Sequence, residues 1–164
     1  MMTKSESDTD TKIILDLPDE KASEQFAAQL ASCLCPSLII TFSGDLGAGK
    51  TTIIRAMLKH LGVQSAIKSP TFSLVESYIC NHLIIHHFDL YRIHHEEELE
   101  YLGFRDYFTQ ESICCIEWAE NAGKTLPNVD IRFKLGIKGA GREMQIMALS
   151  TVGKRILACL AGET

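Results

Sequence analysis

Several features that would define a protein class are missing from this sequence of 164 residues. No apolar run approaches the roughly 20 residues that a membrane-spanning helix needs. The first ten residues are polar and acidic and lack the basic-then-apolar pattern of a signal peptide. We therefore expect a soluble, cytoplasmic protein with no membrane partner. The chain also lacks an excess of basic residues, and its net charge of -5 argues against autonomous binding to nucleic acid.

Cysteine is present, but not at the spacing of common cysteine-based sites. None of the six cysteines forms a Cys-x-x-Cys pair, and three of them lie in apolar, strand-like runs. In such runs a reduced cysteine behaves as a small hydrophobic residue, so we expect no disulfide framework. The length favours one domain over two. We expect a disordered leader over residues 1–11 and a single domain over residues 12–164.

One stretch carries most of the information: Gly44-Asp-Leu-Gly-Ala-Gly-Lys-Thr51 fits the pattern Gly, four residues, Gly-Lys-Ser/Thr. An apolar run over Leu38 to Phe42 precedes it, and apolar residues at helical spacing follow it until Gly62. A strand, a glycine-rich loop and a helix in this order form a phosphate-binding loop, whose backbone N–H groups and helix dipole attract an anion. Lys50 can reach the outer phosphates, and the Thr51 hydroxyl can bind Mg²⁺. The stretch predicts a site for a nucleoside triphosphate.

The pattern along the chain alternates strands and helices. Turn signals at Asn81-His82 and at Gly139-Ala-Gly141 predict two hairpins, so the sheet should be mixed. The predicted fold class is α/β, a P-loop NTPase with three α/β/α layers and a mixed central sheet. The expected strands are 12–17, 38–42, 71–78, 83–88, 112–116, 131–137 and 143–149, with helices after Asp19, after the phosphate loop, at 96–102 and at 151–160.

A phosphate loop needs a carboxylate at the end of a neighbouring strand to hold the water ligands of Mg²⁺ and to orient an attacking water. Two apolar runs end in a carboxylate, one at Asp89 and the other at Glu117. Spacing alone does not decide which of them contacts the metal. We expect Glu117 at the metal and Asp89 close to it, acting either through a water or by positioning the nucleophile.

Other positions allow both a structural and a functional interpretation. Thr71, in the segment Ser69-Pro70-Thr71, belongs either to a plain turn or to a loop that senses the terminal phosphate. Trp118 is either core or a contact surface. Arg142 closes a turn and is either solvated or on the nucleotide. Five of the six histidines lie between residues 82 and 95. A zinc site lacks the spacing and the cysteines, so His87 is expected beside the nucleotide.

Taken together, these motifs resemble those of the TsaE (YjeE) family. The phosphate loop through Thr52, then Lys68-Ser-Pro-Thr-Phe72, His87-Phe-Asp-Leu-Tyr-Arg92 and Glu117-Trp118, occur in the order of the family. The likeness covers about residues 18–150. The histidine block combined with the Glu-Trp pair is far more specific than the loop alone, whereas Phe72 stands where many relatives have Tyr.

The resemblance implies an ATPase that is weak alone and stimulated by a partner, and that supports threonylcarbamoylation of the adenosine beside the tRNA anticodon. The partner would be a TsaB–TsaD heterodimer, with tRNA reached only through the complex, and the cofactors would be ATP and Mg²⁺. Thr51 and Glu117 would hold Mg²⁺, while Asp89 would assist hydrolysis together with Lys50. Trp118 and the Ser69-Pro70-Thr71 loop would report the nucleotide state to the partner. The nucleotide would be held by Glu20, Leu46, Gly47, Ala48, Gly49, Lys50, Thr51, Thr52 and Arg142.

Two alternatives remain open. A nucleotide-dependent binding module with negligible turnover would carry the same loop, and the effect of a partner on hydrolysis separates it from an ATPase. A small-molecule kinase would need an arginine-rich lid. After the helix expected at Glu96 only Arg105 is available, and no basic lid cluster follows. The guanine-reading Asn-Lys-x-Asp of a GTPase is absent from the sequence.

Overall fold

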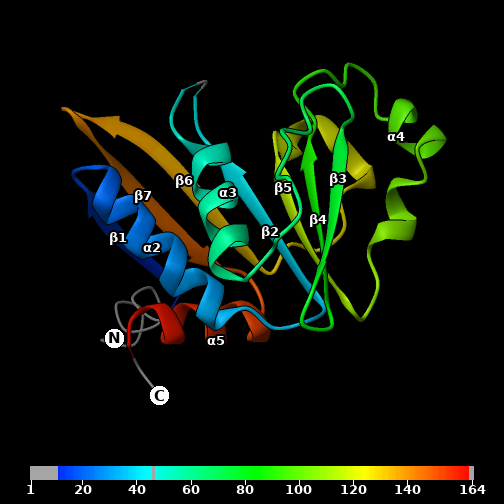
Figure 1. The fold of residues 1–164 in the computed structure, drawn as a ribbon. Helices are drawn as coiled ribbons and strands as arrows, with labels where there is room; N and C mark the ends of the chain where they lie inside the picture. Colours follow the sequence, from blue (N-terminus) through cyan, green and yellow to red (C-terminus); the bar gives the residue numbers. More distant parts are fainter. Residues whose placement is uncertain (1–10, 46, 163–164) are drawn as a thin grey trace, which may run out of the picture.

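The computed structural model describes residues 11–45 and 47–162 of the chain (Figure 1). The strands are β1 (Lys12–Leu17), β2 (Leu38–Ser43), β3 (Val75–Cys80), β4 (Leu83–Asp89), β5 (Ser112–Glu117), β6 (Ile131–Lys138) and β7 (Gly141–Ala148). The α-helices are α2 (Glu20–Cys33), α3 (Lys50–His60), α4 (Glu97–Tyr101) and α5 (Thr151–Leu160). Two 3₁₀ helices, η1 (Phe104–Tyr107) and η2 (Ala119–Thr125), complete the fold. No helix in this described part of the chain combines the length and the apolarity needed to span a bilayer.

The seven strands of the described residues form one sheet, in the order β1-β7-β6-β2-β5-β4-β3. The central strand β2 is parallel to its neighbours β5 and β6, and β4 is parallel to β5. The pairs β1–β7, β6–β7 and β3–β4 are antiparallel. Both expected hairpins are present, and the expected mixed α/β architecture is confirmed. The carboxyl ends of β2, β4 and β5 meet at one edge of the sheet, which is where ligands bind in open α/β folds.

The strand expected from residue 71 begins later than the pattern indicated. The Leu74 N–H donates to the Pro70 carbonyl oxygen at 2.8 Å, which closes a turn, and Leu74 has a positive φ of 69°. The chain becomes extended only at Val75. Residues 1–10 of the expected leader lie outside the described part of the chain, while the Thr11 carbonyl oxygen accepts a hydrogen bond from Ala148 N at 2.7 Å.

Side chains cap two of the helices, whereas no side chain in the described part of the chain caps the helix after the phosphate loop. The Asp19 carboxylate accepts from Ala22 N at the start of α2, and the Ser150 hydroxyl accepts from Gly153 N at the start of α5. Gly49 is the N-cap residue of α3, and its φ of 102° suits glycine. Among the described residues, no side chain makes a capping hydrogen bond there. A helix start without a side-chain cap has N–H groups to offer an anion.

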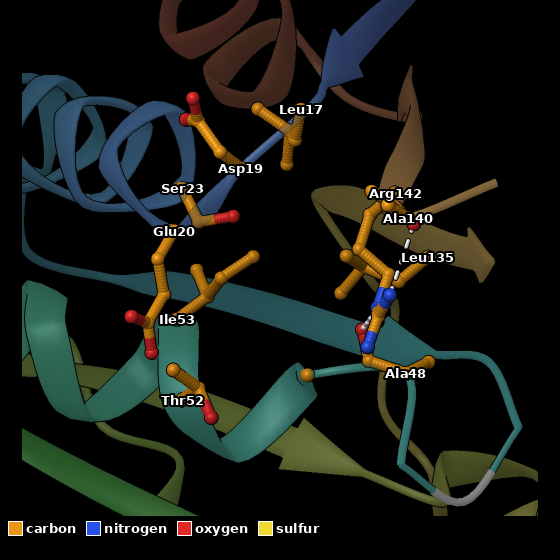
Figure 2. A pocket seen from close by; sticks show the side chains of 12 residues that line it. Leu17, Asp19, Glu20, Ser23, Ala48, Thr52, Ile53, Leu135, Ala140 and Arg142 are labelled. Carbon is orange, nitrogen blue, oxygen red and sulfur yellow. Dashed lines mark hydrogen bonds between the residues drawn. The ribbon is translucent and has the colours of Figure 1, made fainter. Parts of the chain in front are cut away.

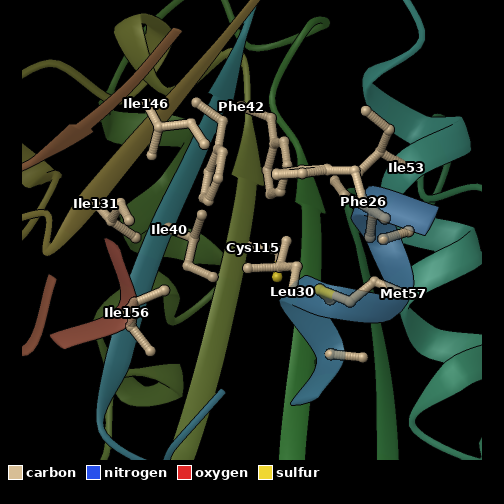
Figure 3. Packing of buried hydrophobic residues seen from close by; sticks show 14 of the residues in the cluster. Phe26, Leu30, Ile40, Phe42, Ile53, Met57, Cys115, Ile131, Ile146 and Ile156 are labelled. Carbon is tan, nitrogen blue, oxygen red and sulfur yellow. The ribbon is translucent and has the colours of Figure 1, made fainter. Parts of the chain in front are cut away.

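Two apolar clusters hold the helices against the sheet. The larger joins one face to α2, α3 and α5 (Figure 3). It includes Phe42 and Phe133, whose rings stack 5.0 Å apart. The smaller lies on the opposite face of β4 and β5, where the Phe88 ring meets the Phe104 ring edge-on at 5.1 Å. Because β5 is buried along its whole length, its last residue, Glu117, is presented from a rigid support.

The expectation for the cysteines is wrong at one place, because Cys33 and Cys159 form a disulfide. These residues are 126 positions apart in the sequence, but the carboxyl-terminal ends of α2 and α5 lie together, and Gln29 Nε2 donates there to the Leu160 carbonyl oxygen at 3.4 Å. Spacing rules detect cysteines that are near one another in sequence and miss a pair that the fold brings together. Cys114 and Cys115 are free and buried, as their apolar runs indicated.

Candidate functional site

The phosphate loop joins β2 to α3 and is fixed from both sides. Gly44 has a φ of 138°, and a methyl group there would collide with the Leu135 carbonyl oxygen, so the position requires glycine. On the other side, Arg142 Nε donates to the Ala48 carbonyl oxygen at 2.8 Å and Nη2 donates to that of Gly47 at 3.2 Å. Two loop carbonyls are thereby bound by the protein itself. Leu46, expected to contribute to the nucleotide site, lies outside the described residues.

Two cavities flank this loop, and Gly49 and Thr52 line both of them. The first, of about 200 Å³, lies between α2, α3 and the β6–β7 hairpin, with Glu20 and Arg142 among its walls (Figure 2). The second, of about 370 Å³, lies at the carboxyl ends of β4 and β5. The second cavity is lined by Gly47, Gly49, Lys50, Thr51, Thr52, Thr71, Asp89, Tyr91, Glu117 and Trp118.

Glu117 connects the phosphate loop to the neighbouring strand. The Thr51 hydroxyl donates to Glu117 Oε1 at 2.9 Å and lies 3.1 Å from Oε2. His87 Nε2 lies 2.6 Å from Glu117 Oε2, and both side chains are only 2% exposed. A carboxylate that is buried this deeply needs partners, and here it has a hydroxyl and an imidazole.

Asp89 lies beside Glu117 in the register of β4 and β5. One carboxylate oxygen accepts from Tyr91 N at 3.0 Å, and the other accepts from the Thr71 hydroxyl at 3.5 Å. Burial raises the pKa of Asp89; the Tyr91 N–H opposes this effect, and the negative charge of Glu117 adds to it. The structure therefore places two carboxylates at the end of adjacent strands, with Glu117 bonded to the loop and Asp89 bonded to the segment before β3.

Lys50 is enclosed within the second cavity. Its amine donates to the Gly44 carbonyl oxygen at 2.5 Å and lies 3.9 Å from the centre of the Trp118 ring. Burial lowers the pKa of this amine, and nearby carboxylates, Glu117 first, partly offset the effect. Trp118 has a φ of 58°, which is rare for a bulky side chain, and its ring lies 5.0 Å from that of Tyr91. Trp118 is half-buried and covers Lys50. It is thus neither purely a core residue nor purely a contact surface, the two interpretations that the sequence left open.

The remaining expected residues are placed less uniformly. Thr71 reaches the second cavity, whereas Ser69 and Pro70 do not line it. Ser69 instead hydrogen-bonds to the Thr71 hydroxyl at 2.7 Å. Sequence reasoning assigned no role to Tyr91, although it stands two positions after a carboxylate that ends a strand. The first cavity is also lined by Leu17, Ser23, Leu135 and Ala140. The sequence did not indicate this role, because these residues are of ordinary types and come from separate elements.

The oxygen atoms in the second cavity fit a magnesium ion. The Thr51 hydroxyl and the carboxylates of Glu117 and Asp89 are hard oxygen donors of the kind that Mg²⁺ prefers. Two neighbouring carboxylates also supply the negative charge that a cation would neutralise. Within residues 11–45 and 47–162, no three His, Cys, Asp or Glu side chains gather as ligands of one ion. A Mg²⁺ ion here would therefore depend on phosphate oxygens and water for its other ligands.

The sheet and the loop define the class of protein: an α/β domain with a mixed central sheet, in which a glycine-rich loop leads from the central strand into a helix beside two strand-end carboxylates. The family model described as "Threonylcarbamoyl adenosine biosynthesis protein TsaE" matches residues 17–145. This chain belongs to the TsaE family.

Individual relatives agree with this assignment. The chain is 40% identical over 150 residues to the tRNA threonylcarbamoyladenosine biosynthesis protein TsaE of Haemophilus influenzae, covering 88% of this chain and 95% of that protein. It is 36% identical over 139 residues to the protein of the same name from Bacillus subtilis, covering 84% of each. The crystal structure of Bacillus subtilis YdiB matches with a TM-score of 0.73 and 25% identity, over 92% of this chain and 95% of that one.

Proposed function

We propose that this chain binds ATP with Mg²⁺ and hydrolyses it, weakly alone and faster on a TsaB–TsaD-type complex, in support of tRNA threonylcarbamoyladenosine biosynthesis. The observation that carries the proposal is the hydrogen bond of 2.9 Å between Thr51 and Glu117. It joins the first turn of the helix after the phosphate loop to a buried carboxylate on the adjacent strand, and Mg-nucleotide hydrolysis needs both groups at one ion. Family membership and the names of the relatives support the pathway.

The two cavities divide the nucleotide between them. In the first, apolar side chains of Leu17, Ile53 and Leu135 offer a surface for a base, with the Glu20 carboxylate and Arg142 as polar groups beside it. Gly49 and Thr52 line both cavities, so a chain of phosphates crossing the start of α3 would lead into the second. In this proposal, ATP occupies both cavities, with its base in the first and its outer phosphates in the second.

The residues of the second cavity have distinct roles in this proposal. Lys50 leaves the Gly44 carbonyl oxygen and the Trp118 ring to bind the outer phosphates. Thr51 and Glu117 would hold Mg²⁺, which would supply positive charge against the charge that develops on the phosphates. Asp89 accepts only a long hydrogen bond from Thr71 on one of its oxygens, so that oxygen is available to orient the attacking water and take its proton.

The same contacts link the nucleotide to the surface. Thr71 bonds to Asp89, and Trp118 covers Lys50, so nucleotide binding changes the surroundings of both. Tyr91 is 46% exposed and packs on Trp118 at the mouth of the cavity. A shift of Trp118 would therefore alter the protein surface at Tyr91. A partner that covers this mouth would sense whether nucleotide is bound.

The test is ATP hydrolysis by the purified protein, alone and with a TsaB–TsaD pair from the same organism, with and without tRNA. The proposal expects slow turnover alone and clear stimulation by the pair. In calorimetric titration, Lys50→Ala should lose ATP binding, whereas Glu117→Ala should keep the part of ATP binding that does not depend on Mg²⁺ and should lose hydrolysis. ATP binding without stimulated turnover would favour a nucleotide-dependent binding module, and transfer of phosphate to a small acceptor would favour a kinase.

A further inference from the structure

His87 is buried in the sheet directly behind the second cavity. Its side chain is 2% exposed, and β4 aligns the residue with Cys115 of β5. The preceding residue, His86, faces the other way and bonds through Nδ1 to the Ser77 hydroxyl at 2.6 Å on the edge hairpin. Two adjacent histidines therefore lie in different environments, and only His87 reaches the site.

The polar contact of the His87 ring is its bond of 2.6 Å to Glu117 Oε2. Among the described residues, Nδ1 has no hydrogen-bond partner. A carboxylate accepts hydrogen bonds, so the ring donates to it through Nε2. A buried imidazole with only one hydrogen-bonded nitrogen stabilises the core no better than an apolar side chain would. Its bond to Glu117 is the feature that requires a histidine here.

Glu117 needs this contact more when the site is occupied than when it is empty. Glutamate has several rotatable bonds, and the neighbouring Asp89 repels its charge. In the structure, Thr51 and His87 both hold the carboxylate. If the Thr51 hydroxyl turns to a metal ion, His87 is the side-chain donor that remains on Glu117 within the described residues.

We propose that His87 is a positioning residue that orients the Glu117 carboxylate toward a nucleotide-bound Mg²⁺ ion. The inference rests on the proposed function and names a residue on which the metal affinity of that site depends. Residues that hydrogen-bond a metal ligand from behind commonly contribute ten- to hundred-fold to metal affinity. His87 acts in this way through Nε2–H, with the rigid strand β4 as its support.

The experiment is calorimetric titration of the full chain with a non-hydrolysable ATP analogue, in Mg²⁺ and in EDTA. His87→Leu removes the donor at similar volume, and His87→Gln replaces it, because a glutamine amide nitrogen can occupy a position close to that of Nε2. His86→Leu is the matched control, one position away on the opposite side of the same strand. Thermal unfolding of each variant is measured in parallel, and His87→Asn, whose amide is too short to reach Glu117, substitutes for His87→Leu if the latter does not fold.

The expected result is that His87→Leu lowers the affinity in Mg²⁺ by at least about tenfold and leaves the affinity in EDTA unchanged. His87→Gln recovers most of the loss, and His86→Leu changes neither value. Equal losses in Mg²⁺ and in EDTA, or no loss in Mg²⁺, would overturn the positioning role. If the unaltered protein does not bind the analogue more tightly in Mg²⁺ than in EDTA, the proposed function itself fails.

Discussion

The buried carboxylate of Asp89 lowers the stability of the folded protein. Its side chain is 8% exposed, and it faces the charge of Glu117, so its ionised form is disfavoured in the folded protein. A carboxyl group whose pKa is raised on folding destabilises the fold once the pH rises through that raised value. Residues placed for catalysis commonly carry such a penalty.

We therefore expect Asp89→Asn to be more stable than the unaltered protein at pH 7, by about 1 kcal/mol, a figure that partial screening by solvent keeps small. Asparagine keeps an oxygen for Tyr91 N but carries no charge. Under the proposed function, the same change should lower partner-stimulated hydrolysis at least about 100-fold, because the carboxylate proposed to take the proton is lost. Urea unfolding and a phosphate-release assay measure the two effects, and a variant that is both less stable and fully active would contradict this account.

His86 gives the hairpin of β3 and β4 a dependence on pH. Burial lowers the pKa of its imidazole. The folded protein thus favours the neutral ring, so stability is complete above the ordinary pKa of histidine and is lost as the pH falls through the lowered value. We expect His86→Phe to lose less stability between pH 8 and pH 5 than the unaltered protein does.

The measurement for His86 is urea unfolding at both pH values. His94→Gln is the control, because it removes one histidine from an exposed position. If His86→Phe and His94→Gln follow the same pH dependence, burial of His86 does not contribute. The comparison does not involve the nucleotide, since the Ser77–His86 pair does not line either cavity beside the phosphate loop.

At the scale of the elements, Asp130 joins three segments at the end of the sheet opposite the phosphate loop. Its carboxylate accepts from Ile39 N at 2.9 Å and from the Ser150 hydroxyl at 2.7 Å. Ser150 in turn caps α5. One side chain therefore connects the start of β2 with the start of the last helix.

We expect Asp130→Ala to destabilise the fold by about 2 kcal/mol, because it leaves one backbone donor without its partner and weakens a helix cap. Affinity for nucleotide should not change, since the site lies at the other end of β2. Thermal unfolding and calorimetry report the two quantities. Asn128→Ala, an exposed neighbour in the same loop, should match the unaltered protein; equal destabilisation by both changes would show that the carboxylate is not the cause.

Elements with strong local patterns could be predicted from the sequence, and those that depend on distant contacts could not. The apolar run before the phosphate loop and the helical spacing after it are local, so β2 and α3 were placed correctly. The start of β3 was not, because the turn at Pro70 to Leu74 has no glycine at its positive-φ position. In the site, motifs located Thr51, Asp89 and Glu117. They did not indicate that Trp118 would cover Lys50 or that Arg142 would hold the loop carbonyls, because these contacts join separate elements.

At the scale of the whole molecule, the disulfide between Cys33 and Cys159 closes a loop of 126 residues, almost the entire domain. Closing so long a loop restricts the unfolded chain strongly, with an expected effect of up to about 4 kcal/mol on the free energy of unfolding. A reducing agent should lower the melting temperature of the unaltered protein to that of Cys33→Ser. Cys35→Ser, which removes a free cysteine, should keep the full response to reductant. A melting temperature that is independent of reductant would show that the bond does not form in solution.

The pairing of β1 with β7 has a consequence for the order in which the protein matures. Among the described residues, β1 is the first strand and stands at the edge of the sheet, and its neighbour β7 is the last strand. A chain emerging from the ribosome thus holds its phosphate loop long before β1 can find its partner. Leu17 of β1 and Arg142 of β7 are aligned with each other and line the same cavity. Under the proposed division of the nucleotide, the base would rest against the cavity wall that β1 and β7 form. A nascent or truncated chain without β7 has the phosphate loop but lacks this wall. We therefore expect tight nucleotide binding only after the whole sheet has formed.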